Sequence, residues 1–144
     1  QAVQEKLGKQ GVVVFGSNYP KTLPKNDFLI VLSNQPAQSF LALLSSATFA
    51  ILSAGDTLLQ AIELQIPCVA APVSSDQPQR LAKCESKELA IASKATSFEL
   101  AKAVEQLLSP ANFKKIEDNI MALPAFDAKS GMIADIQTLV FGGN

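Results

Sequence analysis

Five short apolar runs alternate along the chain with segments of helical periodicity, and this alternation restricts the possible folds most. Each run is continuously apolar, which is typical of strands that are buried on both faces of a parallel sheet. Strands that alternate with helices build such sheets with helices on either side. The sequence therefore predicts an α/β, Rossmann-like fold with parallel strands at Gly11–Phe15, Phe28–Leu32, Thr48–Leu52, Pro67–Ala71 and Leu89–Ser93.

Helix signals lie between and after these runs. Thr96 and Glu99 form a Thr-x-x-Glu capping box, the pattern of a helix N-terminus. Ser109 followed by Pro110 provides an N-cap and a first-turn proline for another helix. No repeat and no long linker divides the chain, so residues 1–144 are predicted to form a single domain. Further helices are expected at residues 1–9, 36–46, from 56 onward, from 76 or 77 to about 84, and at 132–140.

The composition excludes several classes of function. The 144 residues carry a formal net charge of −1, whereas nucleic-acid binders normally show a basic surface, so no nucleic-acid partner is expected. The chain has no histidine, which is the usual general base and the commonest zinc ligand. Triad hydrolysis and histidine-based metal catalysis are therefore excluded within this chain, and no metal site is expected.

The two cysteines, Cys68 and Cys84, give neither a disulfide framework nor a metal-binding spacing. Cys68 lies in an apolar run, where a free thiol packs like a small hydrophobic side chain. Free thiols suit a reducing compartment, and no run approaches the roughly 18 apolar residues that a membrane-spanning helix needs. We therefore expect a soluble, cytoplasmic protein.

Small and polar residues follow two of the predicted strands at the point where each ends. Ser53-Ala54-Gly55 follows one strand, and the Val73–Asp76 segment follows the next. Ligands of doubly wound sheets bind outside the carboxyl ends of the strands, and parallel strands end at the same edge. The two loops are therefore expected to form one ligand site.

The first of these loops enters a helix whose N-terminal N–H groups can bind an anion such as a phosphate. Thr57 can add a hydroxyl donor, whereas the carboxylate of Asp56 would repel a phosphate and is expected to cap the helix instead. Because every α/β fold has such loops, this feature alone does not specify a ligand. In the second loop, Asp76 and Gln77 offer acceptors and an amide suited to sugar hydroxyls. The alternative is an N-cap followed by ordinary early-helix residues.

The segment "SAGDTLLQAIELQIPCVAAPVSSDQPQ" resembles the donor-binding segment of the GT-B glycosyltransferases, which include UDP-glycosyltransferases and the MurG-like transferases. In that family a strand ends in a glycine-rich turn, and the following helix carries a glutamate. A Gly-x-Pro, a buried strand ending in proline, and an Asp-Gln pair come next. Pro67, Pro72, Asp76 and Gln77 match this spacing without a gap. The resemblance covers most of the chain as the C-terminal, nucleotide-binding half of such an enzyme.

The resemblance implies a role for each candidate residue. The diphosphate would lie on the Ser53, Ala54, Gly55, Asp56 and Thr57 loop, the ribose on Gln60, and the sugar on Asp76 and Gln77. The base would rest on the Ser33–Gln35 loop, at Asn34. Gln60 replaces the family's glutamate, the turn lacks its histidine and is one residue shorter, and Gln65 stands where glycine is usual.

Three functions remain open on these grounds. The first is the donor-binding half of an inverting glycosyltransferase, which transfers hexosyl or N-acetylhexosaminyl groups only as part of a larger enzyme. Its catalytic base would come from the missing acceptor-binding half. Any peripheral membrane association would also arise only through that half. The donor would be a nucleotide sugar, with UDP the commonest carrier in the family, and no cofactor is implied. The others are a degenerate interaction or structural domain, and one subunit of a two-chain transferase. The "GVVVF" run matches either the second strand of the family's half or its first.

Overall fold

The computed structural model describes residues 8–19, 22, 25, 27 and 29–124. The chain divides into two compact units, Gln1–Ala42 and Leu43–Asn144, and each is described by itself. Residues 1–7 of the first predicted helix and all of the predicted helix at 132–140 lie outside the described residues. The prediction of a single domain over residues 1–144 stays a prediction.

The first unit contains a parallel pair of strands, sheet A. The β-branched run of β1 (Gly11–Phe15) pairs with β2 (Leu29–Ser33) in the register Gly11 to Leu29 through Phe15 to Ser33. Helix α2 (Ala37–Ser45) follows β2, and the boundary between the two units falls within its residues. These elements match the predicted strands and helix to within two residues.

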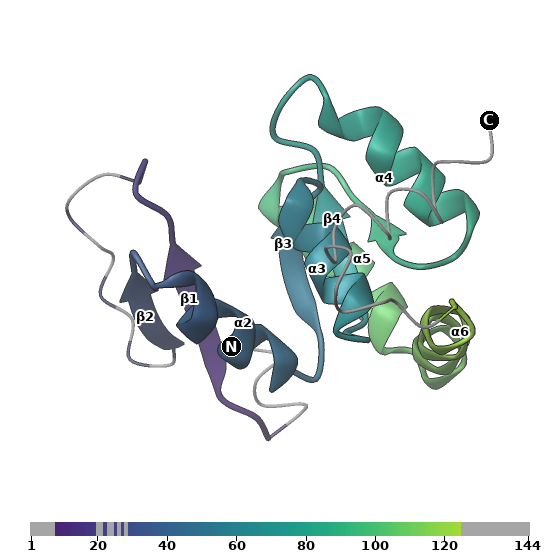
Figure 1. Cartoon of the computed structure of the whole chain (residues 1–144), viewed down its shortest axis with the longest axis horizontal. Coiled ribbons are helices and arrows are strands. Elements are labelled where there is room, and N and C mark those ends of the chain that lie inside the picture. The colour runs from purple at the N-terminus through teal and green to yellow at the C-terminus, as the bar shows by residue number, and fades with distance from the viewer. Residues whose placement is uncertain (1–7, 20–21, 23–24, 26, 28, 125–144) are drawn as a thin grey trace. The chain divides into compact units, whose positions relative to one another are not determined.

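The second unit holds a three-stranded parallel sheet, sheet B, with the order β3-β4-β5. Strands β3 (Ala50–Ser53) and β5 (Ile91–Ala92) flank the central β4 (Cys68–Ala71). Helices α3 and α5 pack on this sheet, and α4 contacts β5 (Figure 1). The α/β class and the parallel strands are confirmed, but the five strands form two small sheets. The bounds of the remaining helices are α3 (Asp56–Glu63), α4 (Gln77–Ser86), α5 (Ser97–Leu108) and α6 (Pro110–Met121).

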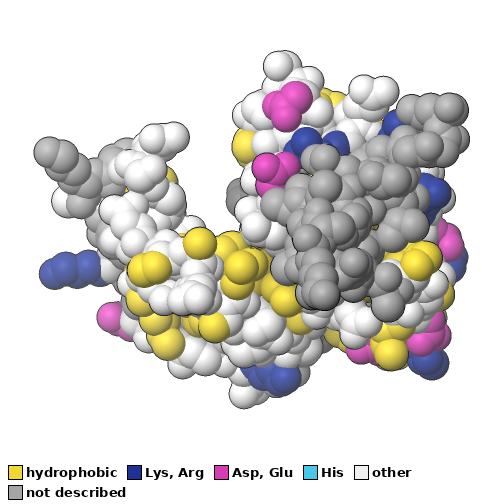
Figure 2. All heavy atoms as spheres, viewed as in Figure 1, with side chains coloured by type: hydrophobic (Ala, Val, Ile, Leu, Met, Phe, Trp, Pro, Cys, Tyr) yellow, Lys and Arg dark blue, Asp and Glu magenta, His cyan; other side chains and the backbone are white. Residues whose placement is uncertain are grey.

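Burial differs between the strands, and here the expectation that all of them are buried on both faces is wrong. Every residue of β4 is buried, because β4 has a strand on each side and helices on its faces. Three of the outer strands expose their second residue: Val12 in β1, Ile30 in β2 and Ile51 in β3. The short outer strand β5 has one buried and one partly buried residue. Figure 2 shows apolar side chains reaching the surface among polar and charged ones.

The core of the second unit lies between sheet B and its helices. The apolar stripe of α3, Leu58, Leu59 and Ile62, is almost completely buried. Cys68 and Cys84 are free and buried, and burial raises the pKa of Cys68 to about 12 and that of Cys84 to about 11. Both thiols are therefore neutral, and they pack as small hydrophobic side chains, as predicted for Cys68.

Both predicted helix caps are present. The Thr96 hydroxyl oxygen accepts a hydrogen bond of 3.3 Å from the Glu99 N–H at the start of α5. The Ser109 hydroxyl oxygen accepts one of 3.4 Å from the Asn112 N–H at the start of α6. No helix within the described part of the chain is long and apolar enough to cross a membrane.

Helix α3 ends in a Schellman motif, and the residue at its left-handed position is a glutamine. Gln65 follows the C-cap with φ of 61°, a left-handed conformation that favours glycine. Its N–H donates to the Ile62 carbonyl at 3.0 Å, and the Ile66 N–H donates to the Ala61 carbonyl at 2.8 Å. By the resemblance described above, Gln65 stands where the GT-B glycosyltransferases usually have glycine, and its backbone has the left-handed conformation that favours glycine.

Candidate functional site

The loops that follow β3 and β4 leave sheet B at the same level. Ser53 and Ala71, the last residues of the two strands, are register partners. The Ala54 N–H donates to the Ala71 carbonyl at 2.9 Å, which extends the pairing by one residue into the first loop. The structure thus brings the two predicted loops together at one edge of the sheet.

The first loop leads into the N-terminus of α3. Ala54 is completely buried, and Gly55 is the N-cap residue, with extended backbone (φ −87°, ψ −156°). The Leu58 N–H bonds to the Gly55 carbonyl at 3.1 Å. The prediction that Asp56 caps this helix is wrong, because the extended residue lies one position earlier and Asp56 is already helical. Thr57 is the second residue of α3, where backbone N–H groups have no acceptor within the helix.

Gln77, at the start of α4, lies between the two loops. Its side chain is buried, and its Oε1 accepts a hydrogen bond of 2.9 Å from the Val73 N–H. Its Nε2 faces the other loop, because a Cβ atom built on Gly55 would lie 3.3 Å from it. A side chain at position 55 would therefore crowd the Gln77 amide.

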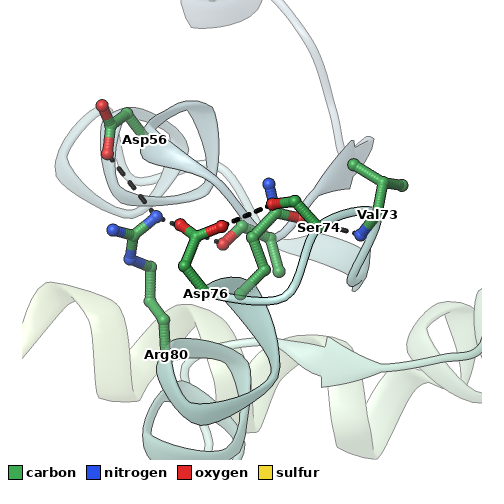
Figure 3. A network of polar contacts seen from close by, with 7 residues as sticks. Asp56, Val73, Ser74, Asp76 and Arg80 are labelled. Carbon is green, nitrogen blue, oxygen red and sulfur yellow. Dashed lines mark hydrogen bonds and ion pairs between the residues drawn. The ribbon is translucent and has the colours of Figure 1, made fainter.

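Asp76 is exposed. The Ser74 hydroxyl donates to its Oδ1 at 2.6 Å, and this bond, with a smaller contribution from Arg80, lowers the pKa of Asp76 (Figure 3). Asp76 occupies the N-cap position of α4 but forms no side-chain cap bond. The alternative of a simple N-cap is therefore correct for the position of Asp76 but not for its side chain. The ionised carboxylate accepts a hydrogen bond from the Ser74 hydroxyl instead.

Arg80 is the residue of this cluster that the sequence analysis missed. Its Nη1 lies 3.5 Å from the Asp56 carboxylate and donates to the Ala54 carbonyl at 3.5 Å (Figure 3). The Arg80 side chain is 21% exposed, against 65% for Asp56. Arg80 comes four residues after Asp76, one helical turn along α4, and this i, i+4 acid–base spacing is the signal that could have revealed it.

The remaining candidates lie further along α3 or in the other unit. Gln60 is partly exposed and comes three residues after Thr57, so both lie on one side of α3. Asn34 belongs to the first unit, where it follows β2 with φ of 48° and its N–H donates to the Phe15 carbonyl at 3.0 Å. The structure therefore brings seven candidates together and places Gln60 one turn on: Ser53, Ala54, Gly55, Asp56, Thr57, Asp76 and Gln77.

The local charges limit which ligands the site suits. Two carboxylates, Asp56 and Asp76, face one guanidinium, that of Arg80. In the described residues there is no group of three or more metal-ligating side chains that could hold a metal ion. An anionic ligand here would depend on Arg80 and on the N–H groups of α3.

Comparison with known proteins identifies the fold. No family model and no curated protein matches the sequence. Among solved structures, the chain is similar to the glycosyltransferase SnogD from Streptomyces nogalater, with a TM-score of 0.59 and 20% sequence identity. This chain has a glycosyltransferase-like fold. The match covers 91% of this chain but 35% of SnogD, so the chain spans about a third of that enzyme's length.

Proposed function

We propose that this chain is the C-terminal, donor-binding half of an inverting GT-B glycosyltransferase. The observation that carries the proposal is the meeting of two loops at the carboxyl edge of sheet B, one of which leads into the N-terminus of α3. In open α/β sheets this is the place where ligands bind. The ligand class that we propose, a nucleotide sugar with UDP as its carrier, is the one that the sequence resemblance to the GT-B glycosyltransferases implies.

The diphosphate would lie at the N-terminus of α3. The free N–H groups and the helix dipole favour an anion there, and the Thr57 hydroxyl adds a donor beside the Ser53–Gly55 loop. Arg80 supplies positive charge at the same place and offsets the Asp56 carboxylate. These groups would stabilise the charge that develops on the departing diphosphate during transfer.

The donor's sugars would lie along the rest of this edge. Asp76 is ionised and exposed, so it can accept hydrogen bonds from neighbouring hydroxyls of the transferred sugar. Gln60, one turn along α3 from Thr57, would bond the ribose. The base would rest near Asn34 in the loop after β2. The side-chain oxygen of Gln77 is already bonded to the Val73 N–H, so we do not propose Gln77 as a ligand of the sugar.

The chain would act as part of a larger enzyme in the cytoplasm. The base that deprotonates the acceptor would come from an acceptor-binding half or subunit, in keeping with a chain that spans 35% of SnogD. No resident cofactor, metal or nucleic acid enters the proposal. Any peripheral membrane association would come from the acceptor-binding half.

A calorimetric titration of the whole chain with UDP tests the proposal. We expect a dissociation constant between micromolar and millimolar, weakened by about tenfold to a hundredfold in Thr57→Ala, since hydrogen bonds to charged groups contribute about 1.5–3 kcal/mol. Thr57→Ser keeps the hydroxyl and should bind nearly as well as the unchanged chain. No heat and no thermal stabilisation at millimolar UDP would contradict the proposal.

One observation favours a second candidate, a domain that keeps the fold and has lost the ligand. Two carboxylates against one guanidinium give the Asp56, Asp76 and Arg80 cluster a formal charge of −1, which opposes a diphosphate. A chain that stays folded but binds neither UDP nor UDP-glucose would support this interaction or structural role.

A further inference from the structure

Gln77 is the only buried polar residue in the described part of the chain, with 9% exposure. Burying an amide costs free energy unless its polar atoms are bonded, so a buried glutamine needs a structural reason. The exposed neighbours on both sides, Asp76 and Pro78, show that the start of α4 as a whole is open to solvent. The inward position is therefore a property of the Gln77 side chain itself.

The bond to Val73 fixes the orientation of the Gln77 amide. A backbone N–H can only donate, so the atom 2.9 Å from the Val73 nitrogen must be the oxygen, Oε1. Nε2 is then directed toward Gly55, in the loop after β3. The side chain thus spans the distance from the loop after β4 to the loop after β3.

Gly55 is the matching half of this arrangement. Its φ of −87° is open to any residue, so backbone conformation does not call for glycine here. The space is tight, however: a Cβ would lie 3.3 Å from Gln77 Nε2, so that the amide would have to shift by a few tenths of an ångström, and 3.7 Å from Ser53 Oγ, an ordinary contact. The missing side chain lets the amide approach the N-cap residue of α3.

This position is unsuited to a sugar contact. A sugar hydroxyl that donated to Oε1 would compete with the Val73 N–H, and the side chain is largely out of solvent. Asp76, the preceding residue, is exposed and ionised, and it offers acceptors without that competition.

We propose that Gln77 is a positioning residue of the donor site and not a sugar ligand. Its amide holds the Val73–Asp76 loop against Gly55 and so sets the direction of the N–H groups at the start of α3. The inference rests on the proposed function and deepens it. It states that binding of the diphosphate depends on Gln77, whereas binding of the transferred sugar does not.

Paired titrations of the whole chain with UDP and with UDP-glucose test this role. Gln77→Met keeps the length of the side chain but removes its hydrogen bonds, and Gln79→Met makes the same change at an exposed position of α4. We expect Gln77→Met to weaken both ligands by the same factor, about fivefold to tenfold, the effect of one lost hydrogen bond. Gln79→Met should leave both affinities unchanged.

Gly55→Ala provides a second variant that keeps Gln77, in case Gln77→Met does not fold. Its Cβ would push the amide by a few tenths of an ångström, so it should also weaken both ligands equally, whereas Gly16→Ala, with nothing within 4 Å of its Cβ, should change neither. A loss confined to UDP-glucose would overturn the inference and make Gln77 a sugar ligand. Unchanged affinities in folded Gln77→Met and Gly55→Ala would also overturn it. If the unchanged chain binds neither ligand, the proposed function itself fails, and this inference fails with it.

Discussion

At the scale of single residues, the site is a balance between one cation and two anions. Arg80 approaches the carboxylate of Asp56 and the carbonyl of Ala54, and it contributes to the low pKa of Asp76. The Asp56 carboxylate is 65% exposed, so its pairing with Arg80 is weak and can be exchanged for another anion. A bound diphosphate would compete with Asp56 for the same guanidinium.

Asp56→Asn should therefore raise the affinity for UDP. The change removes a charge that repels phosphate and releases Arg80, and we expect a gain of about threefold to tenfold at low ionic strength, the effect of about 1 kcal/mol. The gain should shrink as salt screens the exposed charges. Calorimetry over a range of salt concentrations measures it.

The matched control for this prediction is Asp118→Asn, which removes another exposed, paired carboxylate from α6 and changes the net charge equally. Arg80→Gln should have the opposite effect and weaken UDP. An equal gain in Asp118→Asn would mean that net charge alone is responsible, and a loss of affinity in Asp56→Asn would contradict the account of the site.

Gln65 carries a backbone strain that glycine would relieve. A non-glycine residue in the left-handed region costs about 1–2 kcal/mol, and glycine's extra freedom in the unfolded chain returns about 0.4–1 kcal/mol of that. Gln65→Gly should thus raise the free energy of unfolding by up to about 1 kcal/mol, measured by urea denaturation. Gln106→Gly, inside α5, should lower it by about 0.5–1 kcal/mol. A lower stability for Gln65→Gly would refute the assignment of strain.

At the scale of helices and strands, most of the architecture was predictable from the sequence. Strong local signals, such as the capping box at Thr96 and the Ser109-Pro110 pair, set the starts of α5 and α6 correctly. Burial was not predictable, because whether a strand is central, like β4, or outer, like β3, depends on which strands pair.

The candidate site was predictable in part from the pattern of strands. Parallel strands end at one edge, so the meeting of the loops at Ser53–Gly55 and Val73–Asp76 follows from the strand pattern. The inward turn of Gln77 and the reach of Arg80 to Asp56 depend on how α4 lies against the loop after β3. Local sequence carries no information on that placement beyond the spacing of Arg80 from Asp76.

The cap of α5 gives a prediction at this scale, because α5 contacts β4, β5 and α6. Thr96→Ala leaves the Glu99 N–H without its side-chain acceptor and should lower the free energy of unfolding by about 1 kcal/mol. Thr96→Ser keeps an oxygen at the cap and should lose much less. Urea denaturation followed by circular dichroism separates them, and equal losses in the two variants would show that the hydroxyl is not the cause.

At the scale of the whole molecule, the chain has a glycosyltransferase-like fold and about a third of the length of SnogD. Its two units are each built on parallel strands, and the residues proposed for the phosphates and the transferred sugar lie in the second unit. A donor half alone lacks the acceptor side of a transferase.

The chain alone should therefore transfer no sugar. With UDP-glucose and a panel of hydroxyl acceptors, we expect no glycosylated product by mass spectrometry, although UDP-glucose should bind. Glycosylated product that is lost in Thr57→Ala would contradict this expectation. It would show that these 144 residues also provide the acceptor side of the reaction.

The most direct test of the account is to map UDP binding on the backbone amides by nuclear magnetic resonance. During titration of the labelled chain, the account predicts the largest shift changes at the N–H groups of residues 54–57 and 60, with smaller changes at 73–77. Asp56→Asn should reach the same shifts at lower UDP concentration. Shift changes confined to another place, such as the cleft lined by Glu85, Glu88, Gln106 and Lys115, or none at millimolar UDP, would contradict a donor site at the carboxyl edge of sheet B.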